Sequence, residues 1–284
     1  MNWVKNESAD AILFRDTISS SHDRKPSQAK QIWIIYELES AVHSSLYGFS
    51  SQHREQINWT ATYRVDSDIV TPYEKWVYYD EDQKTNPKNR EINFASGKTH
   101  QVAWFVSNCH TTNHRFEYAK KLQKFISVDI YGACGSLQCP RSAQCFDLLD
   151  RKYKFYLSFE NSNCKDYISE KFFVSGLSHN VIPIAMGAPK SDYLRSAPLN
   201  SFIHVDDFSS PQQLAHYLHQ LDQNDTAYNE YFQWKGTGEF INTFFWCRLC
   251  TMVHDGGSAV VGKYNDVKRW WDEGACEKRN NLLV

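Results

Sequence analysis

The sequence has no apolar run close to the roughly 20 residues that a membrane-spanning helix requires, and no signal peptide at its start. We therefore expect the chain as given to be soluble. It also lacks an excess of charge of either sign, because the formal net charge is −2 and the basic residues are dispersed. Dispersed basic residues argue against the basic surface that nucleic-acid-binding proteins use.

A complete zinc-binding cysteine pattern is also missing, because no second CxxC follows Cys247 and Cys250. The eight cysteines are an even number, and three Asn-x-Ser/Thr sequons at Asn6, Asn58 and Asn224 accompany them. Together they indicate an oxidising secretory compartment with disulfides rather than metal ligands. The pairing is left open, and the disulfide candidates are Cys109, Cys134, Cys139, Cys145, Cys164, Cys247, Cys250 and Cys276.

Residues 155–171, FYLSFENSNCKDYISEK, carry the strongest local signal for a ligand site. An apolar run typical of a buried strand turns abruptly polar at Glu160, and Asp166 is a suitable cap for a helix that begins near Tyr167. The unsatisfied N–H groups of a helix start, with Lys171 beside them, favour an anion such as a phosphate. A solvated loop between a strand and a helix is the other interpretation of this pattern.

Strand-like and helix-like segments alternate after residue 98. The strands are expected at 102–106, 126–131, 153–159, 181–186 and 202–205, and the helices at 114–125, 167–177 and 211–221. This alternation predicts a parallel sheet flanked by helices, a Rossmann-like nucleotide domain, although no GxGxxG is present. In the first half, a strand expected at 32–36 ends just before Glu37 and Glu39, and either could act as a general base or simply be solvated.

The wording of 155–171 resembles the signature of the α1,3-fucosyltransferases, glycosyltransferase family 10. Further resemblance follows in the family's order at LES (38–40), YRVDSDI (63–69), VAWFVSN (102–108), IYGACG (130–135) and SFIHVDDF (201–208). GACG, KFYLSFENSNCKDY and KGTGEFINTFFWCRLC look like the invertebrate branch that fucosylates the innermost GlcNAc of N-glycans.

The resemblance implies an α/β fold of the GT-B type, with two Rossmann-like domains facing across a cleft. We expect an acceptor-side domain over 1–97, incomplete at its start, a GDP-fucose-binding domain over 98–246, and a Cys- and Trp-containing segment over 247–284. Members of the family are usually type II membrane proteins of the Golgi apparatus with a lumenal catalytic domain. Membrane attachment would then depend on an N-terminal anchor that is absent from this chain.

The same resemblance assigns roles to individual residues. It selects Glu39 as the catalytic base, and Arg115 and Lys171 as cations that bind the pyrophosphate. The other expected donor-binding residues are Ser107, Asn108, Glu160, Asn161, Tyr167 and Glu170. No tightly bound cofactor or metal site is expected, and a divalent cation (Mn or Mg) would stimulate the reaction rather than be required. The Asp-x-Asp at Asp66 and Asp68 is interpreted as a surface turn or ion pair.

The expected reaction is inverting transfer of L-fucose from GDP-β-L-fucose in α1,3 linkage to O3 of a GlcNAc. The expected acceptor is a glycoprotein whose innermost N-glycan GlcNAc is modified. Two alternatives stay open: a Lewis-type enzyme acting on antennary GlcNAc, and an inactive family member acting as a binding protein.

Overall fold

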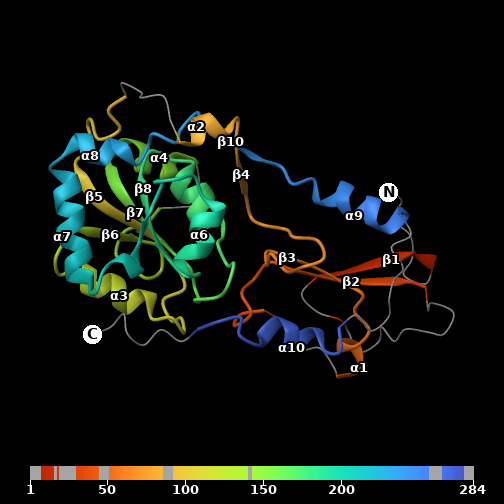
Figure 1. Ribbon diagram of the computed structural model, residues 1–284. Helices are drawn as coiled ribbons and strands as arrows, with labels where there is room; N and C mark the ends of the chain where they lie inside the picture. The colour runs from red at the N-terminus through yellow and green to blue at the C-terminus, as the bar shows by residue number, and fades with distance from the viewer. Residues whose placement is uncertain are drawn as a thin grey trace. The chain divides into compact units, whose positions relative to one another are not determined.

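The computed structural model describes residues 8–15, 18, 30–44, 51–85, 92–139, 143–255 and 264–277. The described residues form two compact units, whose elements are labelled in Figure 1. The first unit draws on Met1–Pro72, Cys164–Asp166 and Asn242–Glu277, and the second on Tyr73–Asn163 and Tyr167–Ile241. Each unit is therefore assembled from segments that are far apart in the sequence.

The first unit contains a three-stranded parallel sheet in the order β1-β2-β3. Its strands are β1 (Ala11–Arg15), β2 (Ile32–Glu37) and β3 (Trp59–Thr62), and its helices are α1 (Ser51–Arg54), α9 (Phe245–His254) and α10 (Val267–Asp272). Ile34 and Trp59 are register partners, and they pack with Leu249 of α9 in one buried apolar cluster. The strand expected at 32–36 is confirmed, and Glu37 forms its last residue.

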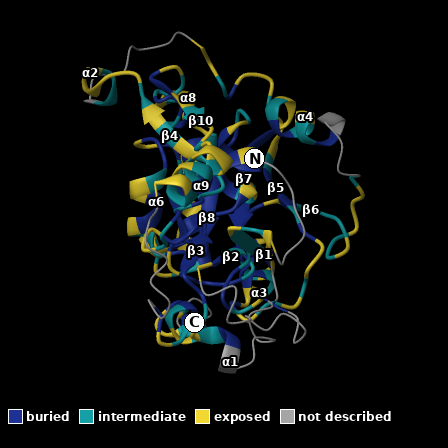
Figure 2. Cartoon of the chain, turned by 90° about the vertical axis from the view of Figure 1, so that its right-hand side faces the viewer, coloured by how far each residue is buried: buried dark blue, intermediate teal, exposed yellow. Residues whose placement is uncertain are grey.

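The second unit is built on a five-stranded parallel sheet in the order β6-β5-β7-β8-β9. The strands are β5 (His100–Phe105), β6 (Val128–Tyr131), β7 (Tyr153–Phe159), β8 (Ile182–Met186) and β9 (Ile203–His204). All residues of β7 and β8 are buried, and the centre of this unit is largely dark blue in Figure 2. Both strands are therefore mainly apolar, although β7 also buries Lys154 and Ser158. The parallel sheet predicted for the second half of the chain is confirmed.

The helices of this unit pack on the sheet through apolar faces such as Leu214, Leu218 and Leu221. They are α3 (Arg115–Leu122), α4 (Ala143–Arg151), α5 (Glu170–Phe172), the π-helix η4 (Phe173–Leu177), α6 (Lys190–Ser196), the 3-10 turn η5 (Val205–Asp207), α7 (Pro211–Asp222) and α8 (Asp225–Glu230). The short helix α2 (Glu81–Thr85) follows β4 (Lys75–Tyr78), which pairs antiparallel with β10 (Gly238–Ile241). Because of this pairing, the stretch before residue 97 joins the second unit from Tyr73 onward.

The strand order places a topological switch point between β5 and β7. From β5 the chain passes through α3 to β6 on one side, whereas from β7 it proceeds to β8 and β9 on the other side. In open parallel sheets, ligands bind outside the carboxyl ends of the strands at such a point. Here those carboxyl ends lead into Ser107 and Glu160.

The helix expected over 167–177 begins later than the sequence indicated. Its N-cap is Ser169, whose side chain accepts a hydrogen bond from the Lys171 backbone N–H, and α5 continues directly into η4. Asp166 has a φ of 60°, and its Oδ2 accepts from Val65 N at 3.1 Å. The capping prediction for Asp166 was wrong because this carboxylate serves a contact made by a distant part of the chain.

Three disulfides are present, and six of the eight candidate cysteines form them. They are Cys109–Cys134, Cys139–Cys145 and Cys164–Cys276. The first joins the segments that follow β5 and β6, and the third closes a sequence separation of 112 residues within the first unit. Cys247 and Cys250 lie on α9 as unpaired thiols.

Candidate active site

The loop after β7 is organised by the carboxylate of Glu160, which is 0% exposed. Its Oε1 accepts from Ser169 N at 2.8 Å and from Ser169 Oγ at 2.9 Å, and its Oε2 accepts from Lys171 Nζ at 3.1 Å. A buried carboxylate needs such donors, because leaving its charge unpaired is costly. Gly187 lies against it, since a Cβ at that glycine would be only 2.8 Å from Glu160 Cβ. Glu160 therefore fixes both the start of α5 and the ammonium group of Lys171.

Lys171 is held in its charged form at the edge of this loop. Its Nζ is 2.9 Å from Ser169 Oγ, and the second neighbouring carboxylate, Glu170, lies 3.5 Å away. Burial acts to lower the pKa of Lys171, but the charges of Glu160 and Glu170 outweigh it and raise the pKa above its ordinary value. The side chain remains 26% exposed, so its cation is available to a ligand.

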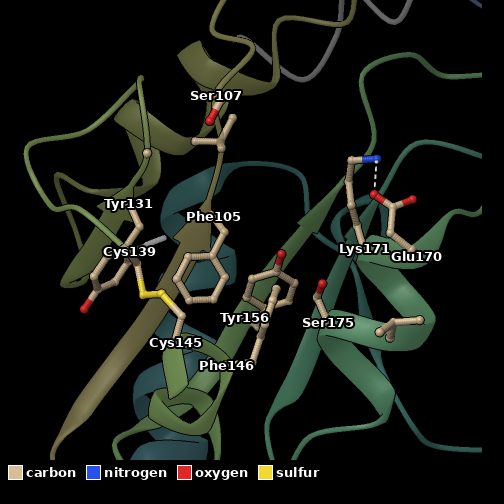
Figure 3. Close-up of a pocket in the computed structure, with 13 residues that line it drawn as sticks. Phe105, Ser107, Tyr131, Cys139, Cys145, Phe146, Tyr156, Glu170, Lys171 and Ser175 are labelled. Carbon is tan, nitrogen blue, oxygen red and sulfur yellow. Dashed lines mark ion pairs between the residues drawn. A yellow bond between two sulfur atoms is a disulfide. The ribbon is translucent and has the colours of Figure 1, made fainter. Parts of the chain in front are cut away.

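A pocket of about 300 Å³ opens at the carboxyl ends of β5 and β6 and is drawn in Figure 3. It is lined by Phe105, Val106, Ser107, Tyr131, Gly132, Cys139, Cys145, Phe146, Tyr156, Glu170, Lys171, Val174 and Ser175. Lys171 and the Ser107 hydroxyl lie on its polar side, and the rings of Phe105, Tyr131 and Tyr156 form an aromatic wall. The pocket therefore combines a fixed cation with flat apolar surfaces, a combination suited to a nucleotide.

Three of the predicted donor residues, Ser107, Glu170 and Lys171, line this one pocket. Sequence reasoning missed Tyr156 and Ser175, which also line it, and the Cys139–Cys145 disulfide in its wall. Burial raises the pKa of Tyr156 above its ordinary value, so that its hydroxyl stays protonated. Ser175 could not be found from the sequence, because it lies on η4, beyond the motif at 155–171.

Arg115 begins α3 and is 4% exposed. Its Nη1 donates to the carbonyl oxygen of Phe159 at 2.7 Å, and its Nη2 donates to that of Asn108 at 3.0 Å. The guanidinium thus joins the ends of β5 and β7 on either side of the switch point. Asn113 strengthens the same junction, since its Nδ2 donates to the Glu160 carbonyl at 2.9 Å. Arg115 is not among the residues that line the pocket in Figure 3.

The remaining predicted donor residues do not line the pocket either. Asn108 is exposed, Tyr167 is buried, and Asn161 is half-buried with its Oδ1 accepting from Ser162 Oγ at 2.9 Å. Glu160 does not line the pocket, but its carboxylate accepts a hydrogen bond from Lys171, which does. The structure therefore brings Ser107, Glu170 and Lys171 together in one pocket and leaves the other predicted donor residues, including Arg115, outside its lining.

Glu39 belongs to the first unit, two residues beyond the end of β2. Its backbone N–H donates to Glu37 Oε1 at 2.7 Å, and its own Oε1 accepts from Ser40 N at 2.8 Å. Glu37 is buried and Glu39 is half-buried. These bonds give Glu37 the role of shaping the turn and leave Glu39 as the more accessible carboxylate.

The Asp-x-Asp of the first unit is occupied by protein contacts. Asp66 receives both Nε and Nη2 of Arg64, at 2.9 and 2.6 Å, and Lys165 Nζ lies 3.6 Å away. Asp68 Oδ2 accepts from Thr60 N at 2.8 Å. Burial acts to raise the pKa of Asp66, but the bonds and charge of Arg64 dominate and lower it. The interpretation of this pattern as an ion pair is thus supported.

The three sequons differ in accessibility. Asn6 lies outside the described residues. Asn58 is 1% exposed, and its Oδ1 accepts from Trp33 N at 2.7 Å, so in the folded chain this side chain is closed to a glycan. Its assignment as a glycosylation site is therefore corrected. Asn224 is exposed and caps α8 through a bond from Ala227 N.

Two further features concern membranes and metals. Among the helices that the structure describes, none has both the length and the apolar character needed to cross a membrane. In the same described ranges, no group of three or more His, Cys, Asp or Glu side chains is placed to hold a metal ion.

Comparison with known proteins gives two family matches that together cover most of the chain. Residues 95–270 match the model of glycosyltransferase family 10 (fucosyltransferase), C-terminal part, and residues 2–74 match the model of the fucosyltransferase N-terminal part. The N-terminal match ends at residue 74, next to the start of the second unit at Tyr73, and the C-terminal match begins at residue 95.

The chain is 52% identical over 276 residues to glycoprotein 3-alpha-L-fucosyltransferase A of Drosophila melanogaster, covering 96% of this chain and 54% of that protein. It is 36% identical over 228 residues to an alpha-(1,3)-fucosyltransferase of Caenorhabditis elegans, covering 80% and 51%. A human 4-galactosyl-N-acetylglucosaminide 3-alpha-L-fucosyltransferase is 37% identical over 259 residues, covering 87% and 68%. The chain thus spans about half the length of the first two relatives.

Solved structures with a similar fold are α1,3-fucosyltransferase crystal structures. One, described with GDP-fucose, has a TM-score of 0.56 at 17% identity and covers 87% of this chain and 79% of that one. Another has a TM-score of 0.57 at 16% identity and covers 89% and 80%. This likeness confirms the predicted α/β fold of GT-B type with two parallel-sheet units. On the family matches and these relatives, the chain belongs to glycosyltransferase family 10, the fucosyltransferases.

Proposed function

We propose that this chain transfers L-fucose from GDP-β-L-fucose, with inversion, to O3 of a GlcNAc in α1,3 linkage. The observation that carries the proposal is the Lys171 cation, fixed by Glu160 at an aromatic pocket beside the switch point of the sheet. A nucleoside diphosphate leaves readily only when its negative charge is neutralised, and a pre-positioned cation does this without reorganising during the reaction.

The donor would bind in the second unit. Lys171 contacts a phosphate as a point charge, and Arg115 adds a second positive charge while it keeps the loops after β5 and β7 in register. Glu170, exposed beside Lys171, accepts hydrogen bonds from the ribose hydroxyls. Ser107, Asn108, Asn161 and Tyr167 complete the predicted donor contacts. Because the protein supplies this positive charge itself, a divalent ion would stimulate the reaction rather than be required.

Glu39 would be the general base. It takes the proton of the acceptor O3 as this oxygen attacks the anomeric carbon from the face opposite GDP, and the single displacement converts the β-linked donor into an α-linked product. The bond from Ser40 N to Glu39 Oε1 helps to hold the carboxylate in place. The transition state has oxocarbenium character, like that of glycoside hydrolysis.

The acceptor proposed is the innermost GlcNAc of an N-glycan on a glycoprotein. Support comes from the 52% identity to the glycoprotein 3-alpha-L-fucosyltransferase of Drosophila, against 37% to the human 4-galactosyl-N-acetylglucosaminide enzyme. The second of these relatives is the reason to keep antennary GlcNAc as the second candidate acceptor. The three disulfides fit the Golgi lumen as the place of action.

Calorimetric titration with GDP, with and without Mn²⁺, tests the donor site first. We expect metal-independent binding by the wild-type chain, a loss of about tenfold or more in affinity for Lys171→Ala, and wild-type affinity for Lys124→Ala. Lys124 is a fitting control because its side chain is exposed and has no contact with the pocket. Equal affinities for the two variants would contradict the phosphate-binding role of Lys171.

Transfer of labelled fucose from GDP-fucose then tests the acceptor. A core-exposed glycopeptide is expected to be the better substrate, and N-acetyllactosamine the poorer one. The reverse order would favour the Lewis-type activity. GDP binding without transfer to either acceptor would favour the inactive, binding-protein alternative.

A further inference from the structure

A second pocket of the Tyr73–Ile241 unit has no role in the chemistry described above. Its volume is about 450 Å³. The residues that line it are Tyr78, Gln83, Lys84, Leu199, Asn200, Glu230, Gln233, Trp234 and Thr237. None of them lines the pocket that contains Lys171. The two cavities therefore share no wall residue.

The second pocket lies at the amino ends of the sheet strands, whereas the first lies at their carboxyl ends. Leu199 and Asn200 lie in the turn that leads into β9. Lys235, next to Trp234, donates to the carbonyl oxygens of Leu177 and His179, which precede β8. These are amino ends of strands, whereas the first pocket is lined by residues that follow β5 and β6. In a parallel sheet these ends lie on opposite edges. Donor chemistry does not explain a pocket in this position.

The pocket is lined by an aromatic ring and by polar side chains that can still form hydrogen bonds with a ligand. The Tyr78 hydroxyl accepts from Leu199 N at 2.8 Å, which fixes its ring. In the described part of the chain, the side chains of Asn200, Glu230 and Gln233 take part in no hydrogen bond or ion pair. Each amide offers donors and an acceptor, and the carboxylate offers acceptors only. All three are thus available to a ligand.

The charges around the pocket indicate a neutral ligand. Lys84 supplies one positive charge, 5.9 Å from the centre of the Tyr78 ring and 3.3 Å from Glu81. Glu230 supplies one negative charge, which opposes the binding of a phosphate or another anion. A purely apolar ligand would leave the amides and the carboxylate without partners, at a cost in affinity. A molecule with many hydroxyl groups satisfies both conditions.

We propose that this pocket is a second saccharide-binding site, which holds a neutral N-acetylhexosamine-containing glycan away from the point of transfer. Saccharide rings present an apolar C–H face to an aromatic ring such as Tyr78, and their hydroxyl and acetamido groups match the amides of Asn200 and Gln233. The volume falls within the range of small-ligand pockets. The inference rests on the proposed function, because the glycan would belong to the glycoprotein acceptor and raise its local concentration.

Photo-cross-linking with a diazirine derivative of N,N′-diacetylchitobiose tests the site directly. We expect adducts in peptides that contain Tyr78–Lys84, Leu199–Asn200 or Glu230–Thr237. Labelling of these peptides is expected to fall about tenfold in a Glu230→Ala, Gln233→Ala double variant, as for the loss of about 1.4 kcal/mol of binding. Wild-type labelling in the double variant, or adducts confined to other peptides, would overturn the proposal.

A matched control is the double variant Glu55→Ala, Gln212→Ala, which removes the same two residue types from exposed positions outside both pockets. It is expected to label as the wild type does. Both double variants should melt at the wild-type temperature, because none of the four side chains packs in a core. If the Glu230→Ala, Gln233→Ala variant melts at a lower temperature than the wild type, the labelling is repeated with Glu230→Gln alone. This substitution keeps the shape of the side chain and removes its charge.

Kinetics separate this proposal from the proposed function. The Glu230→Ala, Gln233→Ala variant should keep the wild-type kcat and KM for a small chitobiose acceptor and show a KM raised several-fold for a glycoprotein. An unchanged KM for the glycoprotein would overturn the glycan-holding role. If the wild-type chain transfers no fucose at all, the proposed function fails, and the cross-link map alone decides whether the second pocket binds saccharide.

Discussion

The two carboxylates next to Lys171, Glu160 and Glu170, allow a direct test of how the loop between β7 and α5 is stabilised. Glu160 is 0% exposed and accepts hydrogen bonds from Ser169 N, from Lys171 Nζ and from the Ser169 hydroxyl, which lies within 2.9 Å of both carboxylate oxygens. Glu170 has a side chain that is 49% exposed and lies 3.5 Å from the same ammonium. Replacing each by Gln changes the same chemical group in a buried and in an exposed setting.

In Glu160→Gln, the new amide must direct its own N–H groups at the Ser169 N–H or the Lys171 ammonium, which are donors, or at the Ser169 hydroxyl, which already accepts from Lys171. The variant loses charge-assisted hydrogen bonds worth about 1.5–3 kcal/mol each, of which one or two cannot be replaced, so we expect the free energy of unfolding to fall by about 2–4 kcal/mol. Glu170→Gln loses an exposed ion pair worth about 0–1 kcal/mol. For a unit of this size, the first loss corresponds to a melting temperature lowered by roughly 4–16 °C.

Thermal unfolding of the two variants and the wild-type chain measures this difference, and GDP titration supplies a second readout. We expect Glu160→Gln to weaken GDP binding as well, because Lys171 loses its anchor, and saturating GDP to recover part of the lost stability. Equal melting temperatures for Glu160→Gln and Glu170→Gln would refute the reasoning. So would a Glu160→Gln variant with a lowered melting temperature and wild-type GDP affinity, because Lys171 would then not depend on its buried partner.

Three further predictions concern other parts of the molecule. Glu39→Gln should lower kcat by about 10²–10⁴-fold at unchanged GDP affinity, as expected for loss of a general base, and a fully active variant would remove Glu39 from that role. Burial lowers the pKa of Lys98 to about 7, so between pH 7 and about 10 this side chain is protonated in the unfolded chain but largely neutral in the folded one. The free energy of unfolding should therefore rise with pH over that window. Urea unfolding of Lys98→Met at a series of pH values should show no such rise. Replacing Cys164 and Cys276 together by Ser should lower the stability of the first unit by about 2–5 kcal/mol, whereas Cys247→Ser, at an exposed unpaired thiol, should leave urea unfolding unchanged.

The prediction of the fold succeeded where the signal is local. The alternation of apolar runs with helical periodicity predicted the parallel sheet of the second unit, because β7 and β8 are buried on both faces and are therefore mainly apolar, with Lys154 and Ser158 as buried exceptions in β7. The helix over 211–221 was predicted by Ser210 and Pro211 at its start, and α7 begins there. The resemblance of residues 155–171 to a family signature, rather than apolar periodicity, pointed to Lys171 and Glu170, which both line the pocket.

Where sequence reasoning failed, a contact between distant residues decided the outcome. Asp166 was expected to cap a helix and instead accepts from Val65, while Ser169 caps α5 under the control of Glu160. Asn58 has the sequon of a glycosylated surface loop, yet it is buried through its bond to Trp33.

The sequence alone determined the α/β class, the order of strands and helices in the second unit, and the family, because these depend on residue patterns within a window of some twenty positions. Tertiary structure alone decided which cysteines pair, which segments complete each unit, and which side chains line the two pockets. These outcomes depend on contacts such as Cys164–Cys276, 112 residues apart, which form only when the chain has folded. A buried group such as Glu160 takes its role from the partners that folding brings to it.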